Sequence, residues 1–130
     1  MQIVQMKLSE IRPYENNPRK NDGAVDAVAN SIKEFGWQQP IVVDSEGVII
    51  AGHTRYKAAK KLKLKTVPVL VVDLDEIKSR EYRIIDNQVA EISKWDYNSL
   101  LRELQMVTGL DMGDFGFEIP TADNGARGGA

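Results

Sequence analysis

The segment Gly52-His53-Thr54-Arg55 has the residue types of an anion-binding site. It follows the apolar stretch Val48-Ile49-Ile50 and precedes residues with helical spacing. Backbone N–H groups at a helix N-terminus point outward, the helix dipole is positive there, and a glycine lets a phosphate approach closely. Arg55 adds a planar guanidinium that can grip two phosphate oxygens. The sequence therefore predicts a phosphate pocket at residues 52–55.

Two other residues of this segment have open roles. His53 is the single histidine of the chain. A lone histidine is more often structural than catalytic, although a neighbouring phosphate pocket makes the two interpretations nearly even. Thr54 could cap the helix or bind phosphate through its hydroxyl. The segment lacks the spacing of a Walker loop, so a P-loop nucleotide site is excluded.

A second candidate site is Asp86-Asn87, inside a long stretch with helical spacing. Asp and Asn are poor residues for a helix interior, because their side chains compete with the backbone for hydrogen bonds. Three explanations stay open: a break in the helix, an exposed polar face, and a set of oxygen ligands for Mg²⁺ beside substrate phosphates.

Two loop segments carry further polar candidates. Trp37-Gln38-Gln39-Pro40 precedes a short apolar strand, and the proline favours an extended conformation at Gln39. The amide of Gln39 could read a base or hold a loop, and the loop role is favoured. Asn17-Pro18-Arg19 places an arginine in a loop near the N-terminus, where it could contact an anion.

Length and composition restrict the class of protein. The chain has 130 residues, 42% of them hydrophobic, which suits one domain with a real core. It has no cysteine, which excludes disulfides, thiolate metal sites and a cysteine nucleophile. No apolar run is long enough for a membrane span, and no signal pattern is present, so we expect a cytoplasmic protein without a membrane.

Charge is distributed unevenly along the chain. Residues 1–72 carry 11 Lys or Arg and 7 Asp or Glu, a balance of +4, whereas residues 73–130 carry 6 and 12, a balance of −6. Six basic residues and no acid lie within residues 53–65. This basic patch favours a local anionic ligand over wholesale wrapping of nucleic acid, although a solvated helix face explains the lysines equally well.

The order of expected elements is β-α-β-β-α-β-α-α, which predicts a compact α/β (α+β) domain with a small mixed sheet and surrounding helices. Strands are expected at residues 3–8, 41–43, 48–50 and 66–72, and helices at about 22–35, 54–62, from 75 onward and after Asp96. Pro68 indicates an edge strand or the beginning of a strand. The expected core positions of the third helix are Ile77, Tyr82, Ile85, Val89 and Ile92.

Four segments in this order resemble the N-terminal domain of the ParB/sulfiredoxin superfamily, over about residues 3–96. They are Asn17-Pro18-Arg19, Gln39-Pro40 with the following strand, the stretch from Val48 to Ala59 around Gly52-His53-Thr54-Arg55, and Asp86-Asn87, with Val67-Pro68-Val69 between the last two. The stretch from Trp95 to Phe117 is similar to the region after this domain in a phage and mobile-element subgroup, often linked to DNA methyltransferases. This leaves open whether the chain is a whole protein or an excised domain.

The resemblance implies a nucleotide site. Partition members of the family bind and hydrolyse CTP with Mg²⁺ and close a clamp around DNA. Their triphosphate segment corresponds to Gly52 through Arg55, their metal-binding pair to Asp86 and Asn87, and their Gln-Pro segment beside the nucleotide to Gln39 and Pro40. Hydrolysis would use Mg²⁺ at Asp86 and Asn87, with Arg55 neutralising charge on the phosphates.

Several positions depart from the family pattern. Thr54, Asp44 and Ala90 stand where partition members often have arginine, and fewer cations weaken triphosphate binding. His53 stands where sulfiredoxins have their catalytic cysteine, so sulfiredoxin chemistry is excluded.

The expected function is a ParB-like domain that binds CTP, ATP or another nucleotide with Mg²⁺ in a DNA-associated process such as partition or phage DNA modification. Weak NTPase activity and a homodimer are further expectations, and DNA could be contacted through other domains or proteins. One alternative is a nuclease or a non-specific DNA-binding module. Another is a non-catalytic adapter domain of a DNA methyltransferase. The expected organisation is a domain at 1–96, a helical extension at 97–119 and a disordered tail at 120–130.

Overall fold

The computed structural model describes residues 2–15, 17, 22–92 and 95–117. Contacts divide the chain into two compact units, residues 1–94 and 95–130, and each is described by itself. The expected domain boundaries at residues 96 and 119 stay predictions, and the expected tail lies outside the described residues, as do Pro18 and Arg19.

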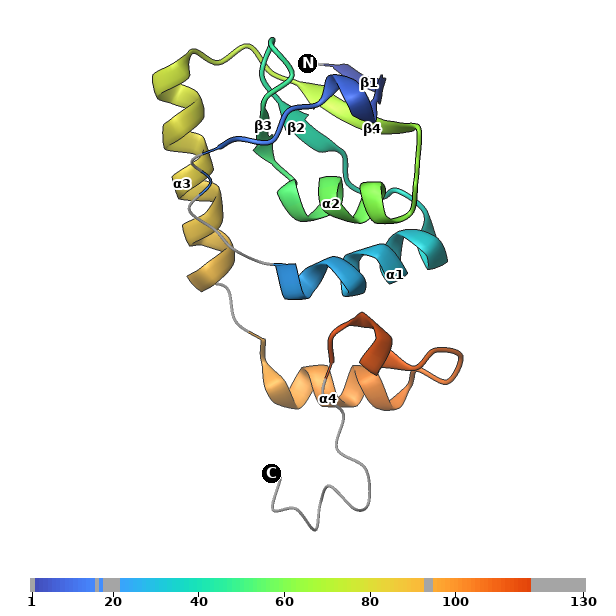
Figure 1. Cartoon of the computed structure of the whole chain (residues 1–130). Coiled ribbons are helices and arrows are strands. Elements are labelled where there is room, and N and C mark those ends of the chain that lie inside the picture. Colours follow the sequence, from blue (N-terminus) through green and yellow to red (C-terminus); the bar gives the residue numbers. More distant parts are fainter. Residues whose placement is uncertain (1, 16, 18–21, 93–94, 118–130) are drawn as a thin grey trace. The chain divides into compact units, whose positions relative to one another are not determined.

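A mixed sheet of four strands forms the centre of the first unit (Figure 1). The strands are β1 (Gln2–Lys7), β2 (Ile41–Val43), β3 (Ile49–Ala51) and β4 (Thr66–Val71), in the spatial order β1-β4-β2-β3. The pairs β1–β4 and β2–β3 are antiparallel, whereas β2–β4 is parallel. The expected mixed sheet is confirmed.

Pro68 lies in an interior strand, so the edge-strand interpretation is wrong. Within β4 it is the third residue and pairs with Gln5 of β1. The parallel pairing of β4 with β2 begins only at Val69, opposite Ile41. Proline has no backbone N–H to donate. At Pro68 this removes no hydrogen bond to β2, because β2 pairs with β4 only from Val69 onward.

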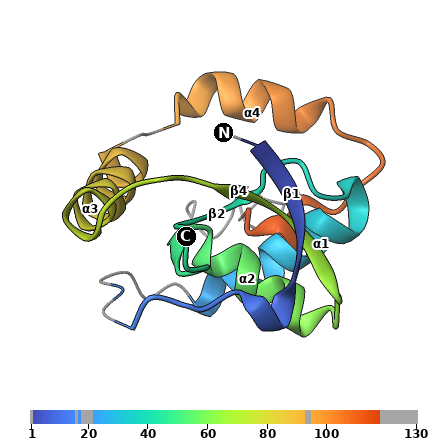
Figure 2. The ribbon, with the colours of Figure 1, turned by 90° about the horizontal axis from the view of Figure 1, so that it is seen from above.

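Two helices lie on one side of the sheet (Figures 1 and 2). Helix α2 (His53–Lys61) packs on the sheet, and α1 (Val25–Phe35) packs against α2. Short 3₁₀ turns at Leu8–Glu10 and Asp22–Ala24 precede the first loop and α1. Gly36 follows the last residue of α1 with a φ of 74°, a backbone conformation that suits a glycine at the end of a helix.

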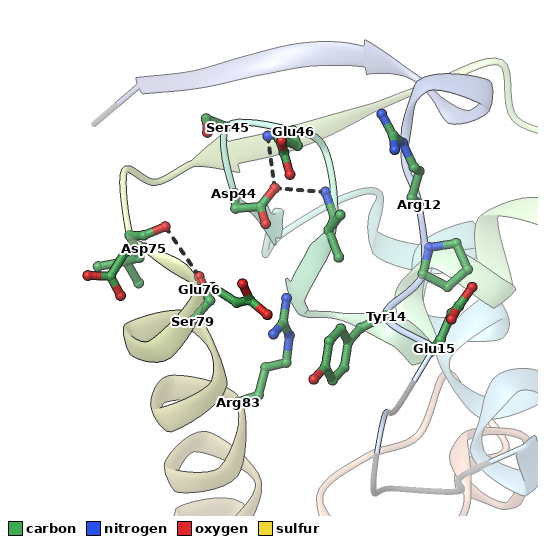
Figure 3. Close-up of a pocket in the computed structure, with 13 residues that line it drawn as sticks. Arg12, Tyr14, Glu15, Asp44, Ser45, Glu46, Asp75, Glu76, Ser79 and Arg83 are labelled. Carbon is green, nitrogen blue, oxygen red and sulfur yellow. Dashed lines mark hydrogen bonds between the residues drawn. The ribbon is translucent and has the colours of Figure 1, made fainter.

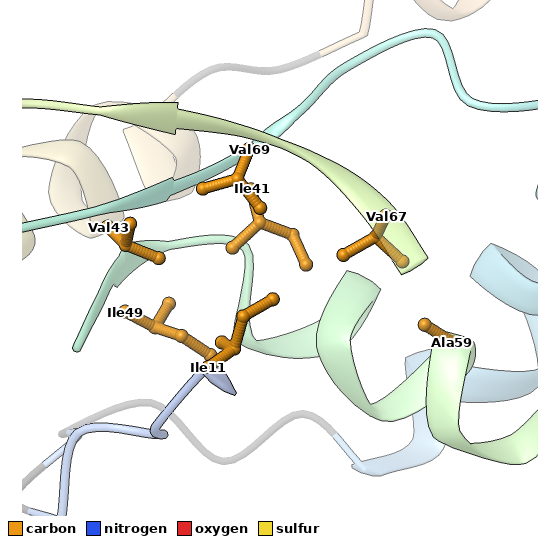
Figure 4. Packing of buried hydrophobic residues seen from close by; sticks show 7 residues of the cluster. All are labelled: Ile11, Ile41, Val43, Ile49, Ala59, Val67 and Val69. Carbon is orange, nitrogen blue, oxygen red and sulfur yellow. The ribbon is translucent and has the colours of Figure 1, made fainter. Parts of the chain in front are cut away.

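The core lies between the sheet and α2 (Figure 4). Alternate residues of β2 and β4 point into it, as a period of two requires. Val42 and Leu70, on the other face of the sheet, are only half-buried. The buried cluster consists of Ile11, Ile41, Val43, Ile49, Ala59, Val67 and Val69.

The third helix, α3 (Glu76–Ile92), has its apolar residues on the outside, which corrects the expected core assignment. Ile77 is 67% exposed and Ile85 is 59% exposed, while Tyr82 and Val89 are also exposed; the side chain of Ile92 is outside the described set. Ser79 and Arg83 are buried instead. Within the first unit, the helix packs mainly against β3, and the face with Ser79 and Arg83 is the covered one.

In the second unit, α4 (Tyr97–Gln105) begins at the expected residue. The Asp96 side chain caps it by accepting a hydrogen bond from the Ser99 N–H, at 3.3 Å. A 3₁₀ turn at Met112–Phe115 follows, and the rings of Trp95 and Phe117 lie 6.0 Å apart. Among the described residues, no helix has the length and apolarity needed to cross a membrane.

Candidate functional site

The start of α2 is shaped by Gly52, which has a φ of 105°. A side chain there would be strained, and its Cβ would lie 3.3 Å from the Cα of Ile41. The helix begins at His53, one residue earlier than expected, and its first bond runs from the Tyr56 N–H to the Gly52 carbonyl, at 2.9 Å. Thr54 is therefore inside the helix and does not cap it. The amides of the first turn have no partner within the helix, which suits an anion.

A pocket of about 320 Å³ lies at this helix start. It brings the Gly52–Arg55 segment together with Asp86 and Asn87 of α3, which are 31 or more positions away in the sequence. Asn17 of the N-terminal loop also lines it, with apolar walls from α1 and β3. Its lining residues are Asn17, Ala24, Val28, Ile50, Ala51, Gly52, His53, Thr54, Arg55, Asp86 and Asn87.

Arg55 stands between this pocket and a neighbouring one of about 220 Å³. The second pocket lies beside the loop after α1, where Trp37, Gln38 and Gln39 line it together with Arg55. The Arg55 Nη2 group donates a hydrogen bond to Oε1 of Gln39. Gln39 is thus next to the arginine, whereas Pro40 lines neither of these two pockets.

The charge of Arg55 is held in a half-buried position. Burial lowers the pKa of its guanidinium, because the charged form loses solvation, and the carboxylate of Asp86 partly offsets this. An anion in the pocket would offset it further. The arginine and the acidic residue therefore contact the same space from α2 and α3.

His53 has a structural partner. Its Nε2 accepts a hydrogen bond from the Tyr14 N–H, at 3.1 Å, which requires a ring nitrogen without a proton. Burial first, then the charges of Arg83 and Lys57, lowers the pKa of His53 to about 4. The ring is therefore neutral near pH 7, so it cannot add a positive charge to the pocket.

Asp86 and Asn87 lie in an unbroken helix, so the helix-break interpretation is wrong. Both line the pocket, with Asp86 exposed and Asn87 half-buried. Within the described residues, no group of three or more His, Cys, Asp or Glu side chains could hold a metal ion by itself. One carboxylate and one amide nevertheless fit Mg²⁺ that takes its other ligands from substrate phosphates and water.

A third and larger pocket, of about 530 Å³, lies between the first loop, the β2–β3 turn and the start of α3 (Figure 3). The Arg83 guanidinium stacks on the Tyr14 ring at 3.7 Å, and its Nε donates to the Ile49 carbonyl at 3.0 Å. Asp44 fixes the turn by accepting from the Glu46 and Val48 amides. Sequence reasoning missed Tyr14 and Arg83. A basic residue in a helix gives no signal of burial, and nothing in the local sequence connects Arg83 with Tyr14 of the first loop.

Comparison with known proteins identifies close relatives. The model of the family "ParB N-terminal domain" matches residues 1–88. The chain is 43% identical over 83 residues to the ParB-like nuclease domain-containing protein YnaK of Escherichia coli, covering 62% of this chain and 95% of that protein. It is 41% identical over 91 residues to the probable chromosome-partitioning protein ParB of Campylobacter jejuni, covering 66% of this chain but only 33% of that protein.

Two solved structures share the fold. One is the truncated chromosome-partitioning protein ParB of Caulobacter crescentus complexed with CTP-gamma-S; its TM-score is 0.71 at 26% identity, over 98% of this chain and 70% of that one. The other is the sulfiredoxin of Arabidopsis thaliana, with a TM-score of 0.54 at 29% identity, over 63% of this chain and 97% of that one. The expected fold class is confirmed, whereas membership of a phage or methyltransferase-linked subgroup is not shown.

Proposed function

Because the chain belongs to the ParB N-terminal domain family, we propose that its pocket at the start of α2 binds a nucleoside triphosphate, with CTP as the first candidate. The observation that carries this proposal is the meeting of Gly52–Arg55 with Asp86 and Asn87 in one pocket. The complex of the Caulobacter crescentus protein with CTP-gamma-S supports the choice of ligand.

Each group in the pocket has a distinct task in this proposal. The free amides of the first turn of α2 donate to phosphate oxygens, and Gly52 keeps the approach open. Arg55 grips the phosphates and neutralises their charge. Asp86 and Asn87 would hold Mg²⁺, which supplies further neutralisation of the phosphates when bound. Hydrolysis would rely on the same Arg55 as charge develops on the transferred phosphoryl group.

The test is calorimetric titration of the whole chain with CTP, UTP, ATP and GTP, with and without Mg²⁺, at one fixed salt concentration. We expect heat of binding with at least one nucleoside triphosphate and tighter binding with Mg²⁺. Incubation of the bound nucleotide, followed by an assay for free phosphate, decides whether it is hydrolysed. Absence of binding by all four would contradict the proposal.

Association with DNA is a second proposal, which the lysines of residues 60–65 support. Lys60, Lys61, Lys63 and Lys65 are exposed, although Lys61 pairs with Asp26 and Lys60 lies over the Tyr56 ring. A direct DNA contact predicts affinity that falls steeply with salt. Binding that is absent at low salt would exclude it. The nuclease and methyltransferase-adapter alternatives stay predictions.

A homodimer is the third part of the proposal, and the exposed face of α3 supports it. Ile77, Ile84, Ile85 and Val89 are each more than half exposed on one helix. The positions 77, 84 and 85 fall within one stripe, given 3.6 residues per turn. An apolar stripe of this kind on an otherwise polar helix is typical of a surface that a second protein covers.

Replacing Ile85 by aspartate is expected to abolish dimer formation in the presence of CTP and Mg²⁺, because a carboxylate would be buried without a partner. Sedimentation velocity of wild type and variant measures this. Ile3→Asp is the matched control. It makes the same substitution at a residue of β1 that is 62% exposed. A wild type that stays monomeric, or an I85D variant that dimerises like wild type, would contradict the proposal.

A further inference from the structure

The side-chain carbonyl of Gln39 accepts a hydrogen bond from the guanidinium of Arg55. We propose that Gln39 is a positioning residue: its side-chain carbonyl holds Arg55 at the junction of the two pockets, so that Gln39 affects the phosphate end of the ligand and does not read the base. This inference rests on the proposed function, and it names which part of the ligand Gln39 affects.

The loop before β2 separates the roles of two neighbouring glutamines. Gln38 folds back, and its Nε2 donates to the Phe35 carbonyl at the end of α1, at 2.7 Å. Gln38 thus holds the loop, a role that the sequence favours for Gln39. Pro40 favours an extended conformation at Gln39, and this residue directs its side chain toward α2, where Oε1 accepts from Arg55.

The contact matters because Arg55 is long and half-buried. An arginine side chain loses rotamer freedom when it is ordered on a ligand, which weakens binding. A bond from Nη2 to Gln39 orders the guanidinium before the ligand arrives and leaves its other N–H groups for phosphate oxygens. Burial disfavours the charged form of Arg55. An anion that binds to the ordered guanidinium therefore stabilises this charge.

The acceptor must be neutral for this purpose. A carboxylate at position 39 would keep the hydrogen bond but would pair its own charge with Arg55, and it would then compete with the phosphates. Two substitutions therefore separate geometry from charge. Gln39→Met keeps the length of the side chain and removes the acceptor, and Gln39→Glu keeps the acceptor and adds a charge.

The experiment compares inorganic triphosphate with CTP as ligands of the intact chain, both measured by calorimetry with Mg²⁺. We expect Q39M to lower the affinity for both ligands by the same factor, on the order of fivefold, because one hydrogen bond is lost. Q39E is expected to weaken both further, on the order of 30-fold, and this loss shrinks as salt is raised. Gln5→Met, an exposed glutamine changed in the same way on β1, is the control and should leave both affinities unchanged.

The outcomes separate this inference from the proposed function. If Q39M weakens CTP and leaves inorganic triphosphate unchanged, Gln39 reads the base and the inference is overturned. Unchanged affinity for both ligands in Q39M also overturns it. A wild type that binds inorganic triphosphate but not CTP contradicts the proposed nucleotide site. In that case, weaker binding of triphosphate by Q39M still supports the Arg55 contact. A wild type that binds neither ligand overturns both.

Discussion

Replacement of Arg55 by alanine is expected to weaken binding of nucleoside triphosphate by about 100-fold or more. The guanidinium offers two parallel bonds to phosphate oxygens, and a hydrogen bond to a charged group contributes roughly 1.5–3 kcal/mol. Arg55→Lys should recover part of this, because lysine keeps the charge but lacks the planar fork. Calorimetric titration of wild type and both variants at one salt concentration measures the effect.

The matched control for Arg55 is Arg102→Ala. Arg102 lies on α4, outside the pocket, and its removal changes the net charge of the chain by the same amount. We expect this control to bind nucleotide as wild type does. If Arg55→Ala binds within about threefold of wild type, a difference below 1 kcal/mol, the phosphate role of Arg55 is wrong.

Gly52→Ala is the second substitution with a large expected effect. The φ of 105° is unfavourable for any residue with a Cβ, at a cost of roughly 1–3 kcal/mol. The added Cβ would also lie 3.3 Å from the Cα of Ile41, where backbone must give way. We expect a total loss of about 2–4 kcal/mol in the free energy of unfolding, measured in urea, because both effects act at one residue.

Gly23→Ala is the control for Gly52 within the same unit. A Cβ at Gly23 would meet no atom within 4 Å, and its φ is not in the left-handed region. Its free energy of unfolding should stay within about 0.5 kcal/mol of wild type. Equal stability of Gly52→Ala and Gly23→Ala would show that the backbone at the start of α2 is not as described.

Much of the fold can be predicted from the sequence because local patterns and tertiary packing agree there. Strands are expected at residues 41–43 and 66–72, and both form. Ile41 and Val43, and Val67 and Val69, are buried in the core, as the period of two in a strand requires. Gly36 ends α1 and Asp96 caps α4 for local reasons, namely left-handed backbone and a side-chain acceptor. These signals depend only on near neighbours in the chain.

The third helix is where sequence reasoning failed. Its apolar periodicity correctly predicts a helix, but periodicity cannot say which face the rest of the chain covers. The sheet covers Ser79 and Arg83, and the stripe containing Ile77 and Ile85 stays exposed. Arg83 is tolerated in the interior because the Ile49 carbonyl and the Tyr14 ring contact it. These two partners are distant in sequence, so no local pattern could reveal them.

Local residue patterns could predict the parts of the candidate site, whereas only the family resemblance joins these parts into one pocket. The anion-binding character of Gly52–Arg55 follows from local residue types. The meeting of Arg55 with Asp86 and Asn87 follows from the fold, because α3 passes the start of α2. The bond from Tyr14 to His53 could not be foreseen. From the sequence, the structural and catalytic interpretations of this lone histidine are nearly even, and the bond gives the ring a structural role.

The most direct test of the central claim is the change in backbone amide NMR shifts when CTP and Mg²⁺ are added to the chain. If the nucleotide binds at the start of α2, the largest changes will fall on residues 52–55 and on Asp86 and Asn87. The turn at residues 44–48, which lines the larger pocket, should change little. Large changes at that turn with unchanged amides at 52–55 would contradict the assignment of the site.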